Sequence, residues 1–252
     1  MFRIVIPARY ASVRLPGKPL RLIAGRPMLE HVYRRALLAG AAEVVVATDD
    51  ERVLAACQAF GATALLTSAS HPSGTDRLGE VATRRGWPEQ SIVVNVQGDE
   101  PFLPPANVAQ VATLLAASPA AAIATLATPI HSLDEFLDPN VVKVVTDAAG
   151  RALYFSRAPI PCVRDALAAA ATGPARYAGA LRHIGLYAYR VAALQRLATL
   201  PAGPLELAER LEQLRALENG LGIVVAVAAE VPGPGVDTEA DLAAADRLMR
   251  GA

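Results

Sequence analysis

The side chains best suited to chemistry in this sequence begin with three cations in one loop. Arg9, Arg14 and Lys18 follow an apolar, β-branched run at 2–6, and Gly17 precedes the last of them. Such a run is typical of a buried strand. Arginine can clamp phosphate oxygens with two parallel hydrogen bonds, and lysine adds a compact positive charge. The loop is therefore a candidate seat for a polyphosphate, although a solvated basic loop would have the same composition.

Two aspartates far apart in the sequence are candidate metal ligands. Asp99 and Asp237 each come after an apolar run that is expected to be a strand. In parallel α/β sheets, ligands bind beyond the carboxyl ends of the strands, where these aspartates would face the basic loop. Mg²⁺ takes carboxylate and phosphate oxygens as ligands. Each aspartate alone is better explained as a helix cap or a turn residue, and only their joint position opposite the basic loop favours a magnesium site.

Several common active-site patterns are absent from the sequence. There is no G-x-G-x-x-G dinucleotide motif, and Gly17-Lys18 is followed by proline, so the basic loop is not a Walker A loop. The patterns H-E-x-x-H and G-x-S-x-G are also missing. We interpret His31, His71 and His131 as surface or packing residues.

The composition is that of an ordinary globular protein. Of the 252 residues, 53% are hydrophobic and 19% are charged, so a substantial core is expected and disorder is not. The formal net charge of +0 gives no sign of a nucleic-acid partner. Cys57 and Cys162 form no C-x-x-C pair and Met1 leads into the first strand without a signal peptide, which suits the cytoplasm. No apolar run is long enough for membrane insertion.

Alternating strands and helices must position these groups. Up to about residue 117, apolar runs alternate with helical patterns that begin near Pro or Asp and stop at Gly. The expected strands are 2–6, 43–47, 62–66 and 91–96, and the expected helices are 28–38, 51–60, 108–117 and one that follows the polar loop 67–75 and ends at Arg84. This alternation indicates βαβ units and an α/β fold, with a mostly parallel twisted sheet flanked by helices.

The second half of the chain is less regular. Strands are expected at 122–128, 141–145, 152–156, 183–189 and 223–227, and helices at 205–217 and 239–249. The helix at 205–217 would place Leu207, Leu211 and Leu214 on one face. The Ala/Gly-rich stretch 166–179 is expected to be a mobile loop with about one helical turn. We predict one α/β domain over 1–252, with an α+β subregion inserted at about 130–220.

Seven motifs in order along nearly the whole chain resemble those of one family. They are R-Y-A-S-V-R-L-P-G-K-P-L (9–20), H-P-S-G-T-D-R (71–77), V-N-V-Q-G-D-E-P (94–101), Y-F-S-R-A-P-I-P (154–161), R-H-I-G-L-Y-A-Y-R (182–190), L-E-Q-L-R (211–215) and P-G-P-G-V-D-T (232–238). Together they are similar to the 3-deoxy-manno-octulosonate cytidylyltransferase (CMP-Kdo synthetase) family, whereas the first alone would indicate only a nucleotidyltransferase. The chain departs from the family pattern in the loop 165–179 and at Cys162, where tryptophan is common and where the wall of the sugar site could change.

The resemblance implies a nucleotide-diphospho-sugar transferase-like, Rossmann-like fold and a magnesium-dependent reaction in lipopolysaccharide biosynthesis. The anomeric hydroxyl of 3-deoxy-D-manno-octulosonate (Kdo) would attack the α-phosphorus of CTP, giving CMP-Kdo and pyrophosphate. Arg9 and Lys18 would hold the triphosphate together with Ala8 and Arg14. The two aspartates would bind the catalytic Mg²⁺, and a second Mg²⁺ would be held largely by the triphosphate. Lys18, Arg9 and the two aspartates are thus the expected catalytic residues.

The resemblance also assigns residues to the cytosine base. Ser73, Thr75 and Arg77, with nearby backbone, would supply the donors and carbonyls that cytosine requires. The same stretch also suits a turn in which Asp76 caps the next helix. Both interpretations can hold together.

The sugar acid needs a cation for its carboxylate and several partners for its hydroxyls. By resemblance, Arg157 is the candidate for the carboxylate. The candidates for the hydroxyls are Gln97, His183, Tyr187, Glu212 and Gln213. Glu209 would share one side of the helix 205–217 with the last two, although plain solvent exposure would give that pattern too. The inserted subregion is implied to form a homodimer interface.

Other activities would use similar groups. A cytidylyltransferase for another acidic sugar, such as a sialic acid or an amino analogue of Kdo, would need the same cations and carboxylates. A non-catalytic CTP-binding regulator with the same fold is a further alternative. The pair Asp99 and Asp237 argues against the regulator, because a pure binder needs no metal at the α-phosphate.

Overall fold

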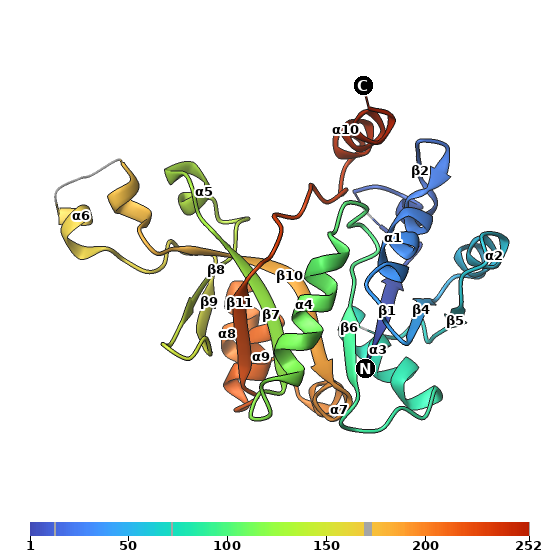
Figure 1. Ribbon diagram of the computed structural model, residues 1–252, viewed down its shortest axis with the longest axis horizontal. Helices are drawn as coiled ribbons and strands as arrows, with labels where there is room; N and C mark the ends of the chain where they lie inside the picture. Colours follow the sequence, from blue (N-terminus) through green and yellow to red (C-terminus); the bar gives the residue numbers. More distant parts are fainter. Residues whose placement is uncertain (13, 72, 169–172, 252) are drawn as a thin grey trace.

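The protein is described by a computed structural model that covers residues 1–12, 14–71, 73–168 and 173–251 (Figure 1). A nine-stranded sheet runs through it in the order β11-β7-β10-β6-β1-β4-β5, with β8 and β9 attached beside β10. The strands of the main path are β1 (Phe2–Ala8), β4 (Glu43–Thr48), β5 (Ala64–Leu66), β6 (Ile92–Asn95), β7 (Ile123–Pro129), β10 (Leu181–Arg190) and β11 (Ile223–Val227).

Along the main path of this sheet, four of the six pairs of neighbouring strands are parallel. β1 pairs in parallel with β4 and β6, β4 with β5, and β7 with β11. On this path β10 lies antiparallel between β6 and β7. It continues antiparallel to β8, and β8 is antiparallel to β9. The predicted α/β sheet, mostly parallel along its main path, is therefore confirmed, and β10 joins its two parallel parts, β11-β7 and β6-β1-β4-β5.

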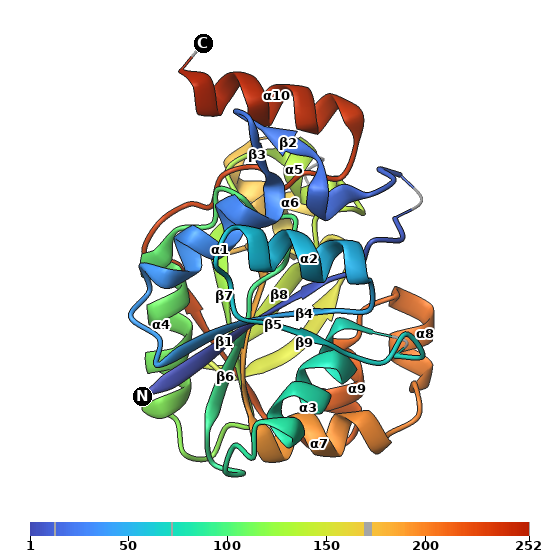
Figure 2. The same ribbon diagram turned by 90° about the vertical axis from the view of Figure 1, so that its right-hand side faces the viewer.

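Helices cover both faces of the sheet (Figure 2). One face is covered by α1 (Met28–Leu37), α2 (Glu51–Ala59) and α4 (Pro105–Ala116), whose buried side chains pack on those of Ile4 and Val94. The other is covered by α3 (Gly74–Arg84), α7 (Val191–Thr199) and α9 (Gln213–Glu218), which pack on Val5 and Val93. Consecutive residues of β1 and β6 thus supply opposite cores, as the alternation of side chains along a strand requires.

The single helix predicted at 205–217 is wrong. The structure has two short helices there, α8 (Pro204–Glu209) and α9 (Gln213–Glu218), separated at Arg210. Arg210 has a φ of 56°, which breaks the right-handed path. Leu211 and Leu214 are buried as expected, but Leu207 is 55% exposed.

A second group of elements extends to one side of the sheet (Figure 1). It contains α5 (Leu133–Leu137), the strands β8 (Lys143–Thr146) and β9 (Ala152–Ser156), α6 (Arg164–Ala168) and the short helix η2 (Pro174–Tyr177). The stretch 166–179 thus contains helical turns at both ends, and residues 169–172 lie outside the described part. The mobility of this stretch and the limits 130–220 of an inserted subregion stay predictions.

The loop that follows β1 meets the C-terminal helix of the chain beyond the carboxyl end of β1. The basic loop leads through a 3₁₀ turn, η1 (Lys18–Leu20), into the small ribbon β2 (Leu22–Ile23) and β3 (Arg26–Pro27), and α10 (Glu239–Arg250) packs on it. The apolar contact between them includes Leu15, Val236 and Leu242. Within the described residues, we find no helix with the length and apolar character needed to cross a lipid bilayer.

Candidate active site

A cavity of about 330 Å³ opens where β1 and β6 end. Six of the predicted residues line it: Ala8, Arg9, Lys18, Ser73, Gln97 and Asp99. Gly98 permits the loop after β6 to approach the end of β1 closely, because a Cβ at this position would lie 3.0 Å from the Pro7 carbonyl oxygen. The structure therefore brings together the basic loop, the predicted base loop and the loop of Asp99.

Lys18 lies between the two predicted metal ligands. Its Nζ is 2.6 Å from Asp99 Oδ2 and 2.9 Å from Asp237 Oδ1. Arg14 is mostly exposed, and its Nη2 lies 3.0 Å from the other oxygen of Asp237. The chain turns into Lys18 at Gly17, whose φ of 66° is in the left-handed region that glycine adopts without strain. Two aspartates 138 positions apart thus share one counter-ion.

The charges in this group influence each other's protonation. Burial lowers the pKa of Lys18, but hydrogen bonds and charge from Asp237 and Asp99 outweigh burial and raise it, so the ammonium stays charged. Burial, aided by the charges of Asp99 and Asp237, raises the pKa of Glu100 to about 7. Glu100 lies within the motif V-N-V-Q-G-D-E-P, but no local pattern in the sequence marks it as a functional residue.

The two aspartates suit a hard divalent cation. The Val236 N–H donates to the Asp99 carbonyl oxygen at 2.9 Å, which holds the two aspartate loops together. The ammonium of Lys18 between the carboxylates indicates that this position stabilises positive charge. No group of three or more His, Cys, Asp and Glu side chains with metal-binding geometry occurs in the described part of the chain. Phosphate oxygens and water would therefore have to complete the coordination of Mg²⁺.

The segment predicted to contact the base forms the N-terminus of α3. Ser73 is the N-cap, and its side chain accepts a hydrogen bond from the Asp76 N–H while the Asp76 carboxylate accepts one from the Ser73 N–H. This capping box satisfies backbone donors at the start of the helix. Ser73 and Gly74 also line the cavity, so the cap and the predicted base contact involve the same turn.

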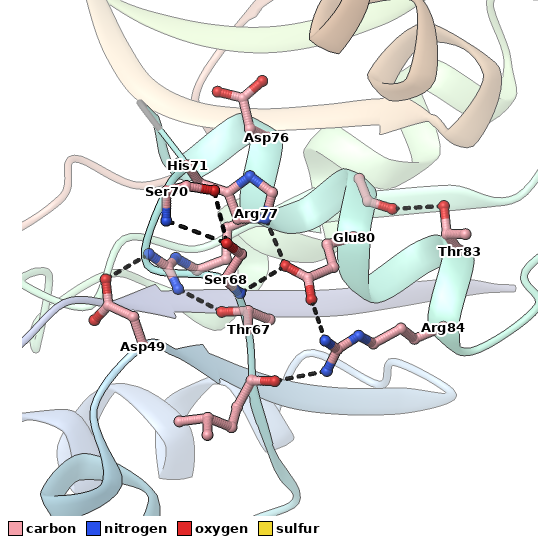
Figure 3. Close-up of polar contacts among 12 residues, drawn as sticks. Asp49, Thr67, Ser68, Ser70, His71, Asp76, Arg77, Glu80, Thr83 and Arg84 are labelled. Carbon is pink, nitrogen blue, oxygen red and sulfur yellow. Dashed lines mark hydrogen bonds and ion pairs between the residues drawn. The ribbon is translucent and has the colours of Figure 1, made fainter.

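Arg77 does not lie where the predicted base contact requires it. Its side chain is fully buried, and the guanidinium donates to Asp49 Oδ2 at 2.7 Å and to the hydroxyl of Thr67 (Figure 3). Thr67 in turn donates to the Thr48 carbonyl oxygen at 2.9 Å. Because every one of these partners follows β4 or β5, or ends β4, Arg77 ties α3 to the sheet instead of lining the cavity.

The break at Arg210 separates acidic residues that were expected on one side of a helix. Glu212 lies near the base loop, where its Oε1 is 3.2 Å from the Ser73 hydroxyl. Burial raises the pKa of Glu212, against hydrogen bonds from Thr75 and Ser73 that lower it. Glu209 instead accepts from the hydroxyl of Ser156 at 2.6 Å. The shared side predicted for Glu209, Glu212 and Gln213 is therefore wrong.

Arg157 is held in place largely by the main chain. Its Nε donates to the Glu209 carbonyl oxygen at 2.7 Å, its Nη1 to the Pro139 carbonyl oxygen at 2.9 Å, and its N–H to the Glu209 carboxylate at 2.9 Å. Arg157 is not among the described residues that line the cavity at β1 or its neighbour beside β10. A contact with a sugar carboxylate would fall to the remaining N–H groups of the guanidinium.

That neighbouring cavity, of about 650 Å³, contains His183 on β10. Its other lining residues include Glu100, Arg182 and the turn 231–235. Tyr187 is buried, with its ring centroid 5.2 Å from that of His183 and 5.7 Å from that of Tyr189. Gln213 begins α9 and is partly exposed. The candidates for the sugar hydroxyls thus lie around β10 and α9, but not in one cavity.

Comparison with known proteins decides the family. Residues 3–223 match the family model described as cytidylyltransferase. The 3-deoxy-manno-octulosonate cytidylyltransferase of Cellvibrio japonicus is 58% identical over 251 residues, covering 98% of each chain, and that of Halorhodospira halophila is 55% identical over 249 residues, covering 99% of this chain and 97% of its own. This chain belongs to the 3-deoxy-manno-octulosonate cytidylyltransferase family.

Solved structures agree with this family membership. A CMP:2-keto-3-deoxy-manno-octonic acid synthetase complexed with CTP superposes with a TM-score of 0.89 and is 48% identical, covering 100% of this chain and 99% of its own. A cytidylyltransferase from Leptospira borgpetersenii, 15% identical with a TM-score of 0.63, shares the fold, covering 99% of this chain and 86% of its own. The resemblance to CMP-Kdo synthetases and the nucleotidyltransferase fold are therefore confirmed.

In this cytidylyltransferase, His183 is expected to make stability depend on pH. Burial lowers its pKa to about 3. The His183 imidazole lies 3.0 Å from the Thr125 hydroxyl. The Thr125 hydroxyl can donate its single proton to the carbonyl oxygen of Ile184 or of Leu186. The Thr125 hydroxyl oxygen is therefore free to accept a hydrogen bond from a neutral His183.

Because the folded pKa lies below the unfolded value, the contribution of His183 is present above about pH 6.5 and lost as pH falls toward 3. We expect that lowering the pH from 7.5 to 5.0 reduces the free energy of unfolding by up to about 2 kcal/mol through His183. Urea unfolding at both pH values measures the loss, and His183→Gln should reduce it. An equal loss in the variant would show that other groups cause it.

Proposed function

We infer that this protein transfers CMP from CTP to the anomeric hydroxyl of Kdo, giving CMP-Kdo and pyrophosphate. The observation that carries this inference is the identity of more than 50% over almost full length with enzymes named for that reaction. The convergence of Arg9, Lys18, Asp99 and Asp237 supports it, since these groups suit a triphosphate.

The chain's own residues would act by positioning and by neutralising charge. Arg9 and Lys18 would hold the phosphates that leave as pyrophosphate, and Arg14 would close on them from the solvent side. We propose that Asp99 and Asp237 bind Mg²⁺, a role supported by their shared contact with the Lys18 ammonium. When bound, Mg²⁺ would supply Lewis-acid stabilisation of the phosphate charge.

The contacts to the two organic parts of the substrates are also proposals. Ser73 and Thr75 at the start of α3 would face the cytosine, with Glu212 behind them. Arg157 would bind the sugar carboxylate. Gln97, His183 and Tyr187 would bind its hydroxyls, with Gln213 at the edge.

Assembly and location extend the proposal. We propose a homodimer formed through the projecting elements, because Leu137, Leu153 and Leu167 there are 48%, 62% and 49% exposed. Light scattering should then give twice the 26.3 kDa chain mass. We also propose a cytoplasmic enzyme of lipopolysaccharide biosynthesis, consistent with CTP as substrate.

Product analysis tests the proposed reaction. The protein is incubated with CTP, Mg²⁺ and, in separate samples, Kdo, its amino analogue and a sialic acid. We expect pyrophosphate release and CMP-Kdo with Kdo. Turnover restricted to another sugar acid would replace the substrate assignment, and CTP binding without turnover would favour a regulator.

Lys143 provides a prediction for the sugar side. It is fully buried, burial lowers its pKa, and its ammonium donates to the carbonyl oxygens of Asp138 at 2.9 Å, Val141 at 2.6 Å and Arg157 at 2.6 Å. Lys143→Met would leave three carbonyls without this donor and release the loop of Arg157. We expect the KM for Kdo to rise about tenfold, with the KM for CTP within about twofold.

Arg151→Met is the matched control, because it removes an exposed cation from the turn that connects the same two strands, β8 and β9. It should leave both KM values unchanged. Equal increases in both KM values for Lys143→Met would contradict a role specific to the sugar side.

A further inference from the structure

Glu80 on α3 gathers three donors around one carboxylate (Figure 3). Its Oε2 accepts from the Ser68 N–H at 2.9 Å and contacts His71 Nε2, while its Oε1 lies 2.6 Å from Arg84 Nη2. Burial would raise the pKa of Glu80, but hydrogen bonds from Ser68 and His71 and the charge of Arg84 lower it. The carboxylate is therefore ionised at neutral pH and able to accept all three bonds.

These bonds fold the loop before α3 back along its own helix. Arg84, one turn beyond Glu80, donates from Nη1 to the Leu66 carbonyl oxygen at 2.6 Å. Glu80 and Arg84 thus hold residues 66, 68 and 71 from a single helix face (Figure 3). Ser73, the cap that lines the cavity, is two positions after His71 in the chain.

The main chain of His71 reaches the phosphate side of the cavity. Its carbonyl oxygen accepts a hydrogen bond from Arg9 Nη2. Arg9 lines the cavity, whereas Glu80 lines a separate hollow behind α3 together with the His71 ring. His71 therefore has its ring on Glu80 and its carbonyl on Arg9.

We propose that Glu80 is a positioning residue for the triphosphate: by holding the His71 ring and the Ser68 amide, it fixes the carbonyl that orients Arg9. The proposal rests on the proposed function, because it assigns Arg9 to the CTP phosphates. Glu80 itself does not touch the nucleotide. If Glu80 only stabilised α3, its loss would affect the use of CTP and of Kdo equally. Its effect would then also be independent of Arg9.

The test is the binding of CTP with Mg²⁺, measured by titration calorimetry, together with the KM for each substrate. Glu80→Ala should raise the Kd for CTP about tenfold and leave the KM for Kdo unchanged. Glu80→Gln keeps an acceptor for the Ser68 N–H and should stay within about threefold of the wild type. The matched control is Asp147→Ala, which also removes a carboxylate bound to backbone N–H groups and to an arginine four residues later, but in the turn after β8.

A double-mutant cycle with Arg9→Ala decides the mechanism. If Glu80 acts through Arg9, the double variant should bind CTP no more than about twofold worse than Arg9→Ala alone. Effects that multiply in the double variant, or an equal change in both KM values for Glu80→Ala, would overturn the proposal. Should Glu80→Ala not fold, His71→Ala replaces it in the cycle, since it removes the ring and keeps the carbonyl. A wild-type protein that does not bind CTP would refute the proposed function, and this inference with it.

Discussion

Replacing Asp99 or Asp237 with asparagine should lower kcat by roughly a thousandfold, because each substitution removes half of the negative charge proposed to hold Mg²⁺. Asparagine keeps the size of the side chain, so the fold should remain. In the free protein the change would also leave the Lys18 ammonium with one counter-ion in place of two. Pyrophosphate release at saturating CTP and Kdo measures the effect.

The control for this pair is Glu239→Gln. Glu239 lies two residues beyond Asp237 and pairs with Arg21 on the surface, away from the cavity. The Glu239→Gln variant should keep nearly full activity, since exposed ion pairs contribute little to stability and this one does not contact the cavity. Wild-type turnover in Asp99→Asn or Asp237→Asn would refute the metal assignment for that residue.

Arg77→Met should lower the free energy of unfolding by about 3 kcal/mol, because it breaks a buried pair and leaves Asp49 without its cation. The side chain of Arg77 is fully buried and that of Asp49 is 17% exposed, so little water can replace the guanidinium. Thr67 loses a donor in the same change. Urea unfolding at pH 7.5 gives the difference.

Arg250→Met tests whether burial is the reason. Arg250 pairs with Asp246 at 2.7 Å, but the side chain of Arg250 is 57% exposed and that of Asp246 34% exposed. Its loss should cost less than about 1 kcal/mol. If the two variants lose the same stability, burial of the Arg77 pair is not what makes it important.

The sequence predicted the sheet well where local signals agree with the tertiary structure. The apolar runs at 2–6, 43–47 and 91–96 became β1, β4 and β6, because β-branched residues suit strands buried on both faces. Asp99 and Asp237 could be placed at one edge of the sheet because each follows a predicted strand, and the carboxyl ends of parallel strands meet at that edge. Their contact with Lys18 depends on a glycine turn and on the end of the chain, which no local pattern describes.

The failures have identifiable causes. The leucine spacing of 205–217 is helical, but the left-handed conformation of Arg210 overrides it, and an arginine gives no local sign of such a turn. Arg77 was assigned to the base by resemblance, as one of the donors in the polar loop 73–77. Its burial depends on a contact with Asp49, 28 positions earlier in the chain, which no local pattern around Arg77 indicates.

The break at Arg210 also has a thermodynamic consequence. On one side of it, Glu209 supports Arg157, the proposed carboxylate partner; on the other, Glu212 lies against Ser73 at the proposed base site. Two residues separate these carboxylates, so displacement of either one is transmitted through a very short piece of backbone. We expect the affinities for the two substrates to be linked, and linkage is reciprocal: the factor by which CTP changes the affinity for Kdo must equal the factor by which Kdo changes the affinity for CTP.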